Sequence, residues 1–123
     1  MRKLSKKTLR NKCDSLWSEI IKLRAKGKCE YCRSTSSLNS HHIFSRSNGS
    51  VRYDINNGVC LCAKHHVFDS RFSAHKAPAE FMAWIEDTRG RDWLMALRKK
   101  SQTISKSNYE LIKVGLEEIK KTY

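Results

Sequence analysis

The pattern of apolar and polar positions predicts a helix near the start of the chain. The stretch "DSLWSEIIKLRAKGK" places its apolar residues at helical spacing, so that they form one stripe. Asp14 or Ser15 can cap the start of this helix, and Gly27 can end it. We therefore expect a helix over residues 14–27. The stripe consists of Leu16, Trp17, Ile20, Ile21 and Leu23.

The middle of the chain predicts a β-hairpin. Residues 36–43, "SSLNSHHI", fit a short strand that ends at two histidines. Residues 58–62, "GVCLC", form a compact apolar run that is typical of a returning strand. Between them, residues 44–57 are rich in serine, asparagine and glycine, which favours a loop. From Ala63 the pattern becomes helical again.

The C-terminal part of the chain predicts further helices. Residues 78–90 begin with the one proline of the chain, at a first helical position, and close on Gly90. Two more amphipathic patterns follow, over residues 91–100 and 108–123. A helix, a hairpin, a helix and a helical extension together predict an α+β fold.

The length of 123 residues suits a single domain over residues 1–123, because it is too short for two good cores. Within it we expect a basic leader over 1–13, a central core over 28–76 and a helical extension over 77–123. No apolar run approaches the roughly 18 residues of a membrane span, and the N-terminus lacks the apolar stretch of a secretory signal. We therefore expect a cytoplasmic protein without a membrane partner.

The net charge of +13 is unevenly distributed. Residues 1–28 hold ten basic and two acidic side chains, and residues 91–123 hold eight and four, whereas residues 29–90 are almost neutral. Such basic arms fit a polyanion, because each neutralised phosphate releases counterions and strengthens binding. The pattern favours a nucleic acid, contacted mainly through its phosphates, over a merely solubilising tail.

The spacing of the cysteines indicates a metal site. The chain has five cysteines, an odd number that argues against a disulfide framework in a reducing compartment. Cys29 and Cys32 form a C-x-x-C pair, and Cys62 and His65 offer a matching C-x-x-H pair. Two such pairs suit one tetrahedral Zn²⁺ in a small domain that is poor in core. We therefore predict a structural zinc site.

Two cysteines remain outside this pattern. Cys60 could replace Cys62 as a ligand, but it lies in an apolar run where a cysteine packs readily as a small hydrophobe. We favour Cys62 because it makes the second pair mirror the first. Cys13 has no partner at metal-binding spacing and is expected to be a free thiol.

The two histidine doublets predict a second site. His65 and His66 are consecutive, and neighbouring residues of a helix point about 100° apart. In a strand, His41 and His42 would face opposite ways. Each doublet can therefore serve two sites, so that one imidazole binds a metal while its neighbour does something else.

In this order, C-x-x-C, "HHI", "NGVCLC" and C-x-x-H followed by histidine resemble the HNH nucleases, whose active site is a ββα-metal unit. The resemblance covers residues 28–76. The leading helix and the trailing "FSAHKAPAEFMAWIE" are most similar to small phage-type members, among them the NinG-like proteins associated with recombination intermediates. The resemblance thus implies a phage or bacterial host cytosol.

The resemblance also implies roles for individual residues. His42 would be the general base that takes a proton from the attacking water, and Asn57 would hold the hairpin loop and orient His42 through its amide. His41 and His66 would bind the catalytic divalent ion. Many members have cysteine where His65 stands, so the zinc site here would be C₃H.

The expected site departs from fuller family patterns at one metal ligand. Where some members have a third histidine, this chain has Ser70, a poor ligand, although Asp69 or His75 could come near instead. Arg46 and Arg71 could each steady a phosphate, or each be a surface charge.

Two functions fit these residues. One is a metal-dependent DNA endonuclease with structural Zn²⁺ and a catalytic divalent ion, Mg²⁺ or Mn²⁺, with Ni²⁺ or Zn²⁺ as alternatives. The other is a non-catalytic zinc module that binds nucleic acid. The histidine doublets favour the enzyme, since a zinc module does not need them. The sequence leaves open whether one or both strands are cut, and whether the C-terminal helix packs back on the domain or pairs with another chain.

Overall fold

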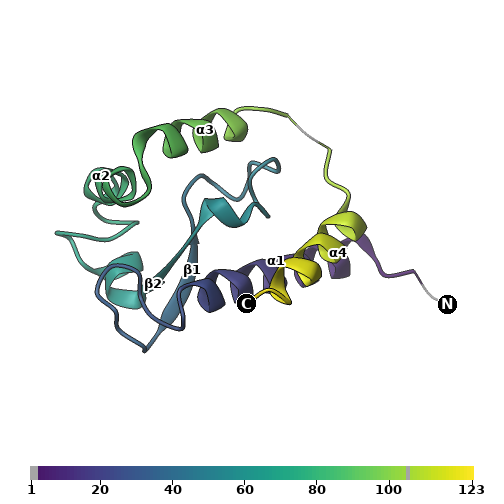
Figure 1. Cartoon of the computed structure of the whole chain (residues 1–123), viewed down its shortest axis with the longest axis horizontal. Helices are drawn as coiled ribbons and strands as arrows, with labels where there is room; N and C mark the ends of the chain where they lie inside the picture. Colours follow the sequence, from purple (N-terminus) through teal and green to yellow (C-terminus); the bar gives the residue numbers. More distant parts are fainter. Residues whose placement is uncertain (1–2, 105) are drawn as a thin grey trace.

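A two-stranded β-hairpin lies between two pairs of helices, which makes the chain α+β. The computed structural model describes residues 3–104 and 106–123, so residues 1–2 of the expected leader and residue 105 of the expected extension lie outside the described residues. In chain order the elements are α1 (Lys6–Arg24), β1 (Leu38–His42), β2 (Gly58–Cys62), α2 (Pro78–Arg89), α3 (Arg91–Ser101) and α4 (Tyr109–Lys120). Figure 1 shows α1 and α4 side by side along one side of the hairpin, and α2 and α3 along the other.

Helix α1 begins at Lys6, well inside the expected basic leader. Ser5 caps it, because its hydroxyl oxygen accepts a hydrogen bond of 3.1 Å from a backbone N–H of the first turn. Leu9 and Cys13 are buried, and Cys13 packs in one cluster with Leu116 of α4. The prediction of a helix start at residue 14 was therefore wrong. Burial against a distant helix stabilises a segment whose own composition is mostly basic.

The other helix boundaries follow the capping residues. Helix α1 ends at Arg24, shortly before Gly27, which adopts a positive φ of 68°. Pro78 is the first residue of α2, as its position in the sequence predicted. Gly90 separates α2 from α3 with a φ of 94°, a conformation that favours glycine. Asn108 caps α4 through its side-chain oxygen.

The predicted hairpin is confirmed. Strands β1 and β2 are antiparallel, with Leu38 opposite Cys62 and His42 opposite Gly58. Every residue of β2 is buried, whereas every residue of β1 is half-buried. This register places the two histidines of β1 beside the start of β2, at the end of the hairpin where the 43–57 loop joins the strands.

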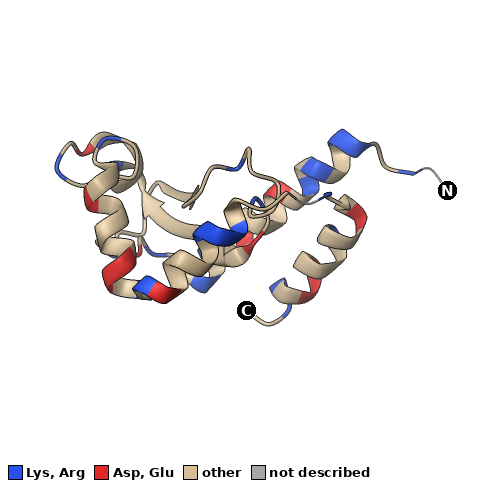
Figure 2. Cartoon of the chain, turned by 90° about the horizontal axis from the view of Figure 1, so that it is seen from above, with Lys and Arg blue, Asp and Glu red and all other residues tan. Residues whose placement is uncertain are grey.

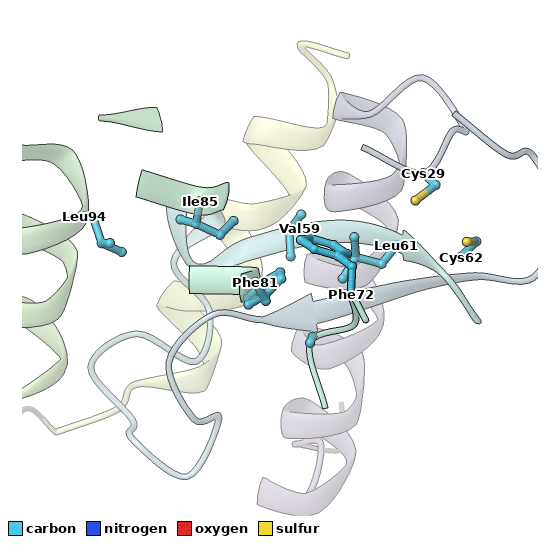
Figure 3. Close-up of a cluster of buried hydrophobic side chains, with 9 residues drawn as sticks. Cys29, Val59, Leu61, Cys62, Phe72, Phe81, Ile85 and Leu94 are labelled. Atoms are coloured by element: carbon cyan, nitrogen blue, oxygen red, sulfur yellow. The ribbon is translucent and has the colours of Figure 1, made fainter. Parts of the chain in front are cut away.

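The side chains of β2 alternate between two cores, one on each face of the hairpin. Val59 and Leu61 belong to the core under α2 and α3, whereas Cys60 belongs to the core under α1 and α4. Figure 3 shows the first core, in which Val59 and Leu61 meet Phe72, Phe81, Ile85 and Leu94, with Cys29 and Cys62 at one end. The second core also contains Cys13, Trp17, Ile20, Ile21, Tyr53 and Leu116.

Helix α1 crosses the hairpin in close contact at Gly58. A Cβ atom at this position would lie 2.3 Å from Cδ1 of Ile21 and 2.8 Å from a ring carbon of Trp17. Glycine is therefore needed here for the approach of helix and strand rather than for a special backbone angle.

The helix expected from Ala63 is a single π-helical turn, Lys64–Phe68. It stops at Asp69, whose carboxylate accepts a hydrogen bond of 2.8 Å from the backbone N–H of Arg71. The chain then folds back along the turn, because the N–H of His75 donates to the carbonyl of His66 at 3.0 Å. This return brings His75 close to His66, which no local sequence pattern predicted.

Helix α4 packs back on α1, one of the two alternatives that the sequence left open. Leu116 is buried between them, and the Cys13 thiol donates to the Tyr109 carbonyl at 3.4 Å. The opposite face of α4 exposes Leu111 and Val114. Among the described helices, none has the length and apolar character that crossing a membrane requires.

Candidate functional site

The two cysteine pairs converge on one point. One ligand atom from each of Cys29, Cys32, Cys62 and His65 lies within 4.8 Å of the others. The sulfurs of Cys32 and Cys62 are 3.6 Å apart, and the Cys62 sulfur lies 3.3 Å from Nδ1 of His65. Four ligands around Zn²⁺, with Zn–S distances of about 2.3 Å, would separate sulfurs by about 3.8 Å. The four residues could thus hold a metal such as zinc, and they fit a closed tetrahedral site.

The first cysteine pair lies in a tight turn after α1. The N–H of Cys29 donates to the Ser34 carbonyl at 2.8 Å, and the N–H of Arg33 donates to the Cys29 carbonyl at 2.9 Å. Burial alone would raise the pKa of the Cys29 thiol, but hydrogen bonds from the backbone N–H groups of Cys32, Cys62 and Tyr31 outweigh it and lower the pKa. The turn therefore favours the thiolate form of Cys29, whereas burial raises the pKa of Cys32.

Cys60 lies on the other side of the strand from this cluster. It is fully buried in the core under α1, where burial raises the pKa of its thiol to about 11. Cys62 occupies the ligand position, as the mirrored spacing predicted. Cys13 is also buried in the α1 core, apart from the metal ligands.

Three histidines form a second cluster. His41 comes from the end of β1, His66 from the 64–68 turn and His75 from the segment that returns along it. Nε2 of His66 lies 3.1 Å from Nδ1 of His41 and 3.2 Å from Nε2 of His75. If Nε2 of His66 carries a proton, it can donate a hydrogen bond to only one of these two nitrogens well. If it carries none, its lone pair faces the lone pair of any neighbouring nitrogen that is also unprotonated. A cation resolves this repulsion, and nitrogens bound to one ion at about 2.1 Å lie roughly 3.0–3.4 Å apart.

His75 is the member of this cluster that sequence reasoning did not assign. Its spacing from His66 matches no regular helix, and the backbone bond between the two residues positions it. Asp69, the other residue considered, instead forms an ion pair of 3.7 Å with Lys64.

Burial favours the neutral form of two of these imidazoles, those of His41 and His66. Together with the neighbouring His66 and His75, burial lowers the pKa of His41 to about 3. Burial also lowers the pKa of His66, with His75 adding to the effect. Neutral imidazoles have the lone pairs that metal coordination needs.

His42 faces the opposite way from His41, as expected for neighbours in a strand. Its ring stacks on Trp17 of α1, with centroids 3.8 Å apart and planes 6° from parallel. Its Nε2 lies 2.9 Å from the carbonyl oxygen of Arg52 in the hairpin loop. Burial lowers the pKa of His42. The two neighbouring histidines therefore lie in separate environments, one among imidazoles and one against an indole.

Asn57 is fully buried and holds the hairpin loop. Its Oδ1 accepts from the N–H of Phe44 at 2.8 Å, and its Nδ2 donates to the carbonyls of Phe44 and Val51 at 2.9 and 3.2 Å. Among the described residues, the expected bond from this amide to His42 is absent, because the loop backbone takes up both of its polar atoms. Asn57 thus holds the loop that contains Arg52, whose carbonyl lies against His42.

Both arginines considered as phosphate contacts are exposed, but they lie in different environments. The charge of Arg46 reaches His42 and disfavours its protonation. Arg71 lies beside Asp69, whose carboxylate accepts its backbone N–H. Arg46 is therefore the arginine on the His42 side of the hairpin.

No family model, curated protein or solved structure matches this chain.

Proposed function

We propose that this protein is a metal-dependent endonuclease of the HNH type that hydrolyses DNA phosphodiester bonds. The observation that carries the proposal is the divergence of His41 and His42 at the end of β1. His41 joins a cluster of three imidazoles, while His42 is held separately by Trp17 and a carbonyl. A hairpin followed by a helical turn, with ligands from both, supports the ββα-metal arrangement that the sequence resemblance implies.

The hydrogen bond of His42 defines which of its nitrogens can act as a base. A carbonyl oxygen can only accept, so the bond of 2.9 Å to Arg52 requires the proton on Nε2. Nδ1 of the neutral ring then carries the lone pair. We assign to Nδ1 the removal of a proton from the attacking water, which lets the water oxygen bond to phosphorus as the bond to the leaving oxygen breaks.

The three imidazoles are the residues that would hold the catalytic ion. When bound, a divalent ion would neutralise charge that develops on the scissile phosphate and its leaving oxygen. Three nitrogen ligands favour Mn²⁺, Ni²⁺ or Zn²⁺ over Mg²⁺, which prefers oxygen. His75 is exposed and the other two histidines are half-buried, so this cluster is more open to solvent than the cysteine cluster, in which three of the four ligands are buried. An open set of three protein ligands is typical of catalytic rather than structural metal sites.

Exposed basic residues support DNA as the substrate. Figure 2 shows Lys and Arg gathered on the N-terminal half of α1, where Lys6, Lys7, Arg10 and Lys12 are exposed. Because this segment is helical, its charges are held at defined positions along the helix. They can therefore contact a phosphate backbone without the loss of conformational entropy that ordering a flexible arm would cost.

A plasmid assay tests the proposal. Purified protein would be incubated with supercoiled DNA in EDTA, Mg²⁺, Mn²⁺, Ni²⁺ or Zn²⁺, beside His42→Ala. We expect nicked or linear DNA with a transition metal, and a loss of about 10²–10⁴-fold in His42→Ala because a general base is removed. Asn39→Ala is a matched control, since Asn39 lies on the same strand and bonds only locally.

If the wild type leaves supercoiled, branched and single-stranded DNA intact with every metal, the proposal is wrong. Binding of DNA without cleavage would instead support the non-catalytic zinc module, which needs the cysteine cluster and the basic residues alone. Equal activity of His42→Ala and Asn39→Ala would remove His42 from the mechanism.

A further inference from the structure

Two contacts hold the ring of His42, and they restrict different motions. Stacking on Trp17 holds the plane of the ring. A half-turn of the ring about its Cβ–Cγ bond keeps that plane, however, and exchanges the positions of Nδ1 and a carbon. The hydrogen bond from Nε2 to the Arg52 carbonyl selects one of these two orientations. The direction of that carbonyl therefore decides where the basic nitrogen points.

The carbonyl of Arg52 lies in a loop without regular secondary structure. Asn57 holds the preceding carbonyl, that of Val51, at 3.2 Å. The indole N–H of Trp17 holds a later one, that of Asp54, at 2.9 Å. The peptide of Arg52 itself has a backbone bond from its N–H to the Asn48 carbonyl at 3.1 Å. The side chains of Val51 and Tyr53 on either side are buried, and the arginine side chain adds a further anchor.

The Arg52 side chain contacts α1, where it forms a bidentate ion pair with Asp14. Nε of Arg52 donates to Oδ1 at 3.0 Å, and its second guanidinium nitrogen donates to Oδ2 at 2.8 Å. Exposure of the two side chains is 21% and 34%, so the pair is partly shielded from water. A bidentate pair restricts both distance and angle, which a single hydrogen bond does not.

We propose that Asp14 and Arg52 are positioning residues for His42. Their ion pair ties the loop to the same helix that supplies the stacking indole, so that the carbonyl and the indole hold the imidazole as one unit. This inference rests on the proposed function for its catalytic meaning, but not for its geometry. Without the ion pair, the loop peptide can rotate and the hydrogen bond from Nε2 of His42 is lost. The ring of His42 then also populates the flipped orientation and the tautomer with its proton on Nδ1. Neither state presents a lone pair at the reacting position.

Asp14→Asn is the most informative variant. It keeps the shape of the side chain and one acceptor, and it leaves the Arg52 charge free. If Arg52 served only to bind DNA phosphate, freeing its charge would lower KM or leave the reaction unchanged. A positioning role instead predicts a fall in kcat of roughly 10–100-fold at nearly constant KM. Arg52→Gln should lower kcat to a similar degree, and the double variant should be no worse than either single one.

Glu19→Gln provides the matched control. Glu19 also lies on α1 and forms an ion pair, with Lys120 of α4, on the surface away from His42. We expect its kcat, KM and zinc content to equal those of the wild type. Melting temperatures of all variants would show whether a loss of activity merely follows a loss of stability. A fall in kcat in Glu19→Gln as large as in Asp14→Asn would overturn the inference.

A spectroscopic readout separates this inference from the proposed function. In ¹⁵N-histidine-labelled protein, His42 should show a single tautomer with its proton on Nε2, and Asp14→Asn should show a mixture of tautomers. If the wild type cleaves no DNA but the tautomer shifts as expected, the nuclease proposal fails and the positioning role holds. An unchanged His42 tautomer in both Asp14→Asn and Arg52→Gln would overturn the positioning role, whatever the activity.

Discussion

The cysteine cluster and the histidine cluster differ in how the chain builds them. The cysteine cluster takes its four ligands from two local pairs, each within one turn, and three of the four are buried. The histidine cluster takes three ligands from three separate segments, and none of them is fully buried. A closed site with local pairs suits stability, whereas an open site assembled from distant segments leaves room for a ligand. This contrast is what we would expect if the two sites had the different tasks that we propose.

The two clusters nevertheless share one structural element. The 64–68 turn carries His65 into one and His66 into the other. Loss of the cysteine cluster should therefore disturb the histidine cluster, while the reverse effect should be small. This asymmetry can be tested by perturbing each region in turn.

The largest effect is expected from the cysteine cluster. Cys29→Ser should abolish zinc binding and unfold most of the chain, because structural zinc in small domains contributes about 10 kcal/mol or more. Metal analysis and circular dichroism of the purified protein would measure this. Cys60→Ala is the control and should keep one zinc per chain. If Cys60→Ala lost zinc instead, the assignment of Cys62 as the ligand would be wrong.

A smaller effect is expected where α1 meets the hairpin. Gly58→Ala should lower the free energy of unfolding by about 1–3 kcal/mol, because the added methyl group would lie 2.3 Å from the Ile21 side chain. Denaturant titration would measure the change, and zinc content should stay constant.

Gly115→Ala serves as its control, since a Cβ there meets no atom within 4 Å and Gly115 lies within α4. It should stabilise the protein by about 0.5–1 kcal/mol through helix propensity. Equal destabilisation by the two variants would contradict the close-approach argument.

Substitution in the histidine cluster should change the affinity for a metal ion rather than the stability of the fold. His75→Ala should weaken binding of Mn²⁺ or Zn²⁺ at the second site about 10–100-fold, because it removes one of three ligands, and should change stability by less than about 0.5 kcal/mol. Calorimetric titration of protein that already holds its structural zinc would measure the affinity. Ser70→Ala is the control. Identical affinities in His75→Ala and the wild type would show that His41 and His66 bind the ion without it.

Stability should also depend on pH. In protein without an ion at the histidine cluster, the pKa of His41 lies at about 3, below its unfolded value near 6.5. The unfolded chain then binds more protons between these values, so His41 contributes stability above pH 6.5 that is lost as pH falls toward 3. The slope is at most about 1.4 kcal/mol per pH unit. The free energies of unfolding of the wild type and His41→Gln should approach each other as the pH is lowered from 7 to 5. A constant difference between them would show that His41 is not the cause of the pH dependence.

Residue spacing in the sequence predicted the structure correctly wherever residues a few positions apart determine it. The hairpin, the helix caps at Pro78 and Gly90 and the two cysteine pairs all depend on residues a few positions apart. Turn geometry and strand alternation act over that range, so the pattern alone predicts which atoms meet. Even the divergence of His41 from His42 follows from strand alternation.

The features that sequence reasoning missed depend on contacts across the chain. Ser5 is the one local signal we identify for a helix start at Lys6, and sequence reasoning missed it because α4 supplies the surface that stabilises this first part of α1. Likewise, His75 reaches the cluster through a backbone bond to His66, and Asp14 supports the loop through Arg52 rather than capping a helix.

The sequence by itself thus determined the ligands of the cysteine cluster and the opposite directions of the histidine pair, since both follow from short-range backbone geometry. Only the tertiary structure decided the third histidine and the anchoring of His42 against α1. Both depend on where segments far apart in the chain come to lie, and that is determined by the packing of the two cores on either side of the hairpin.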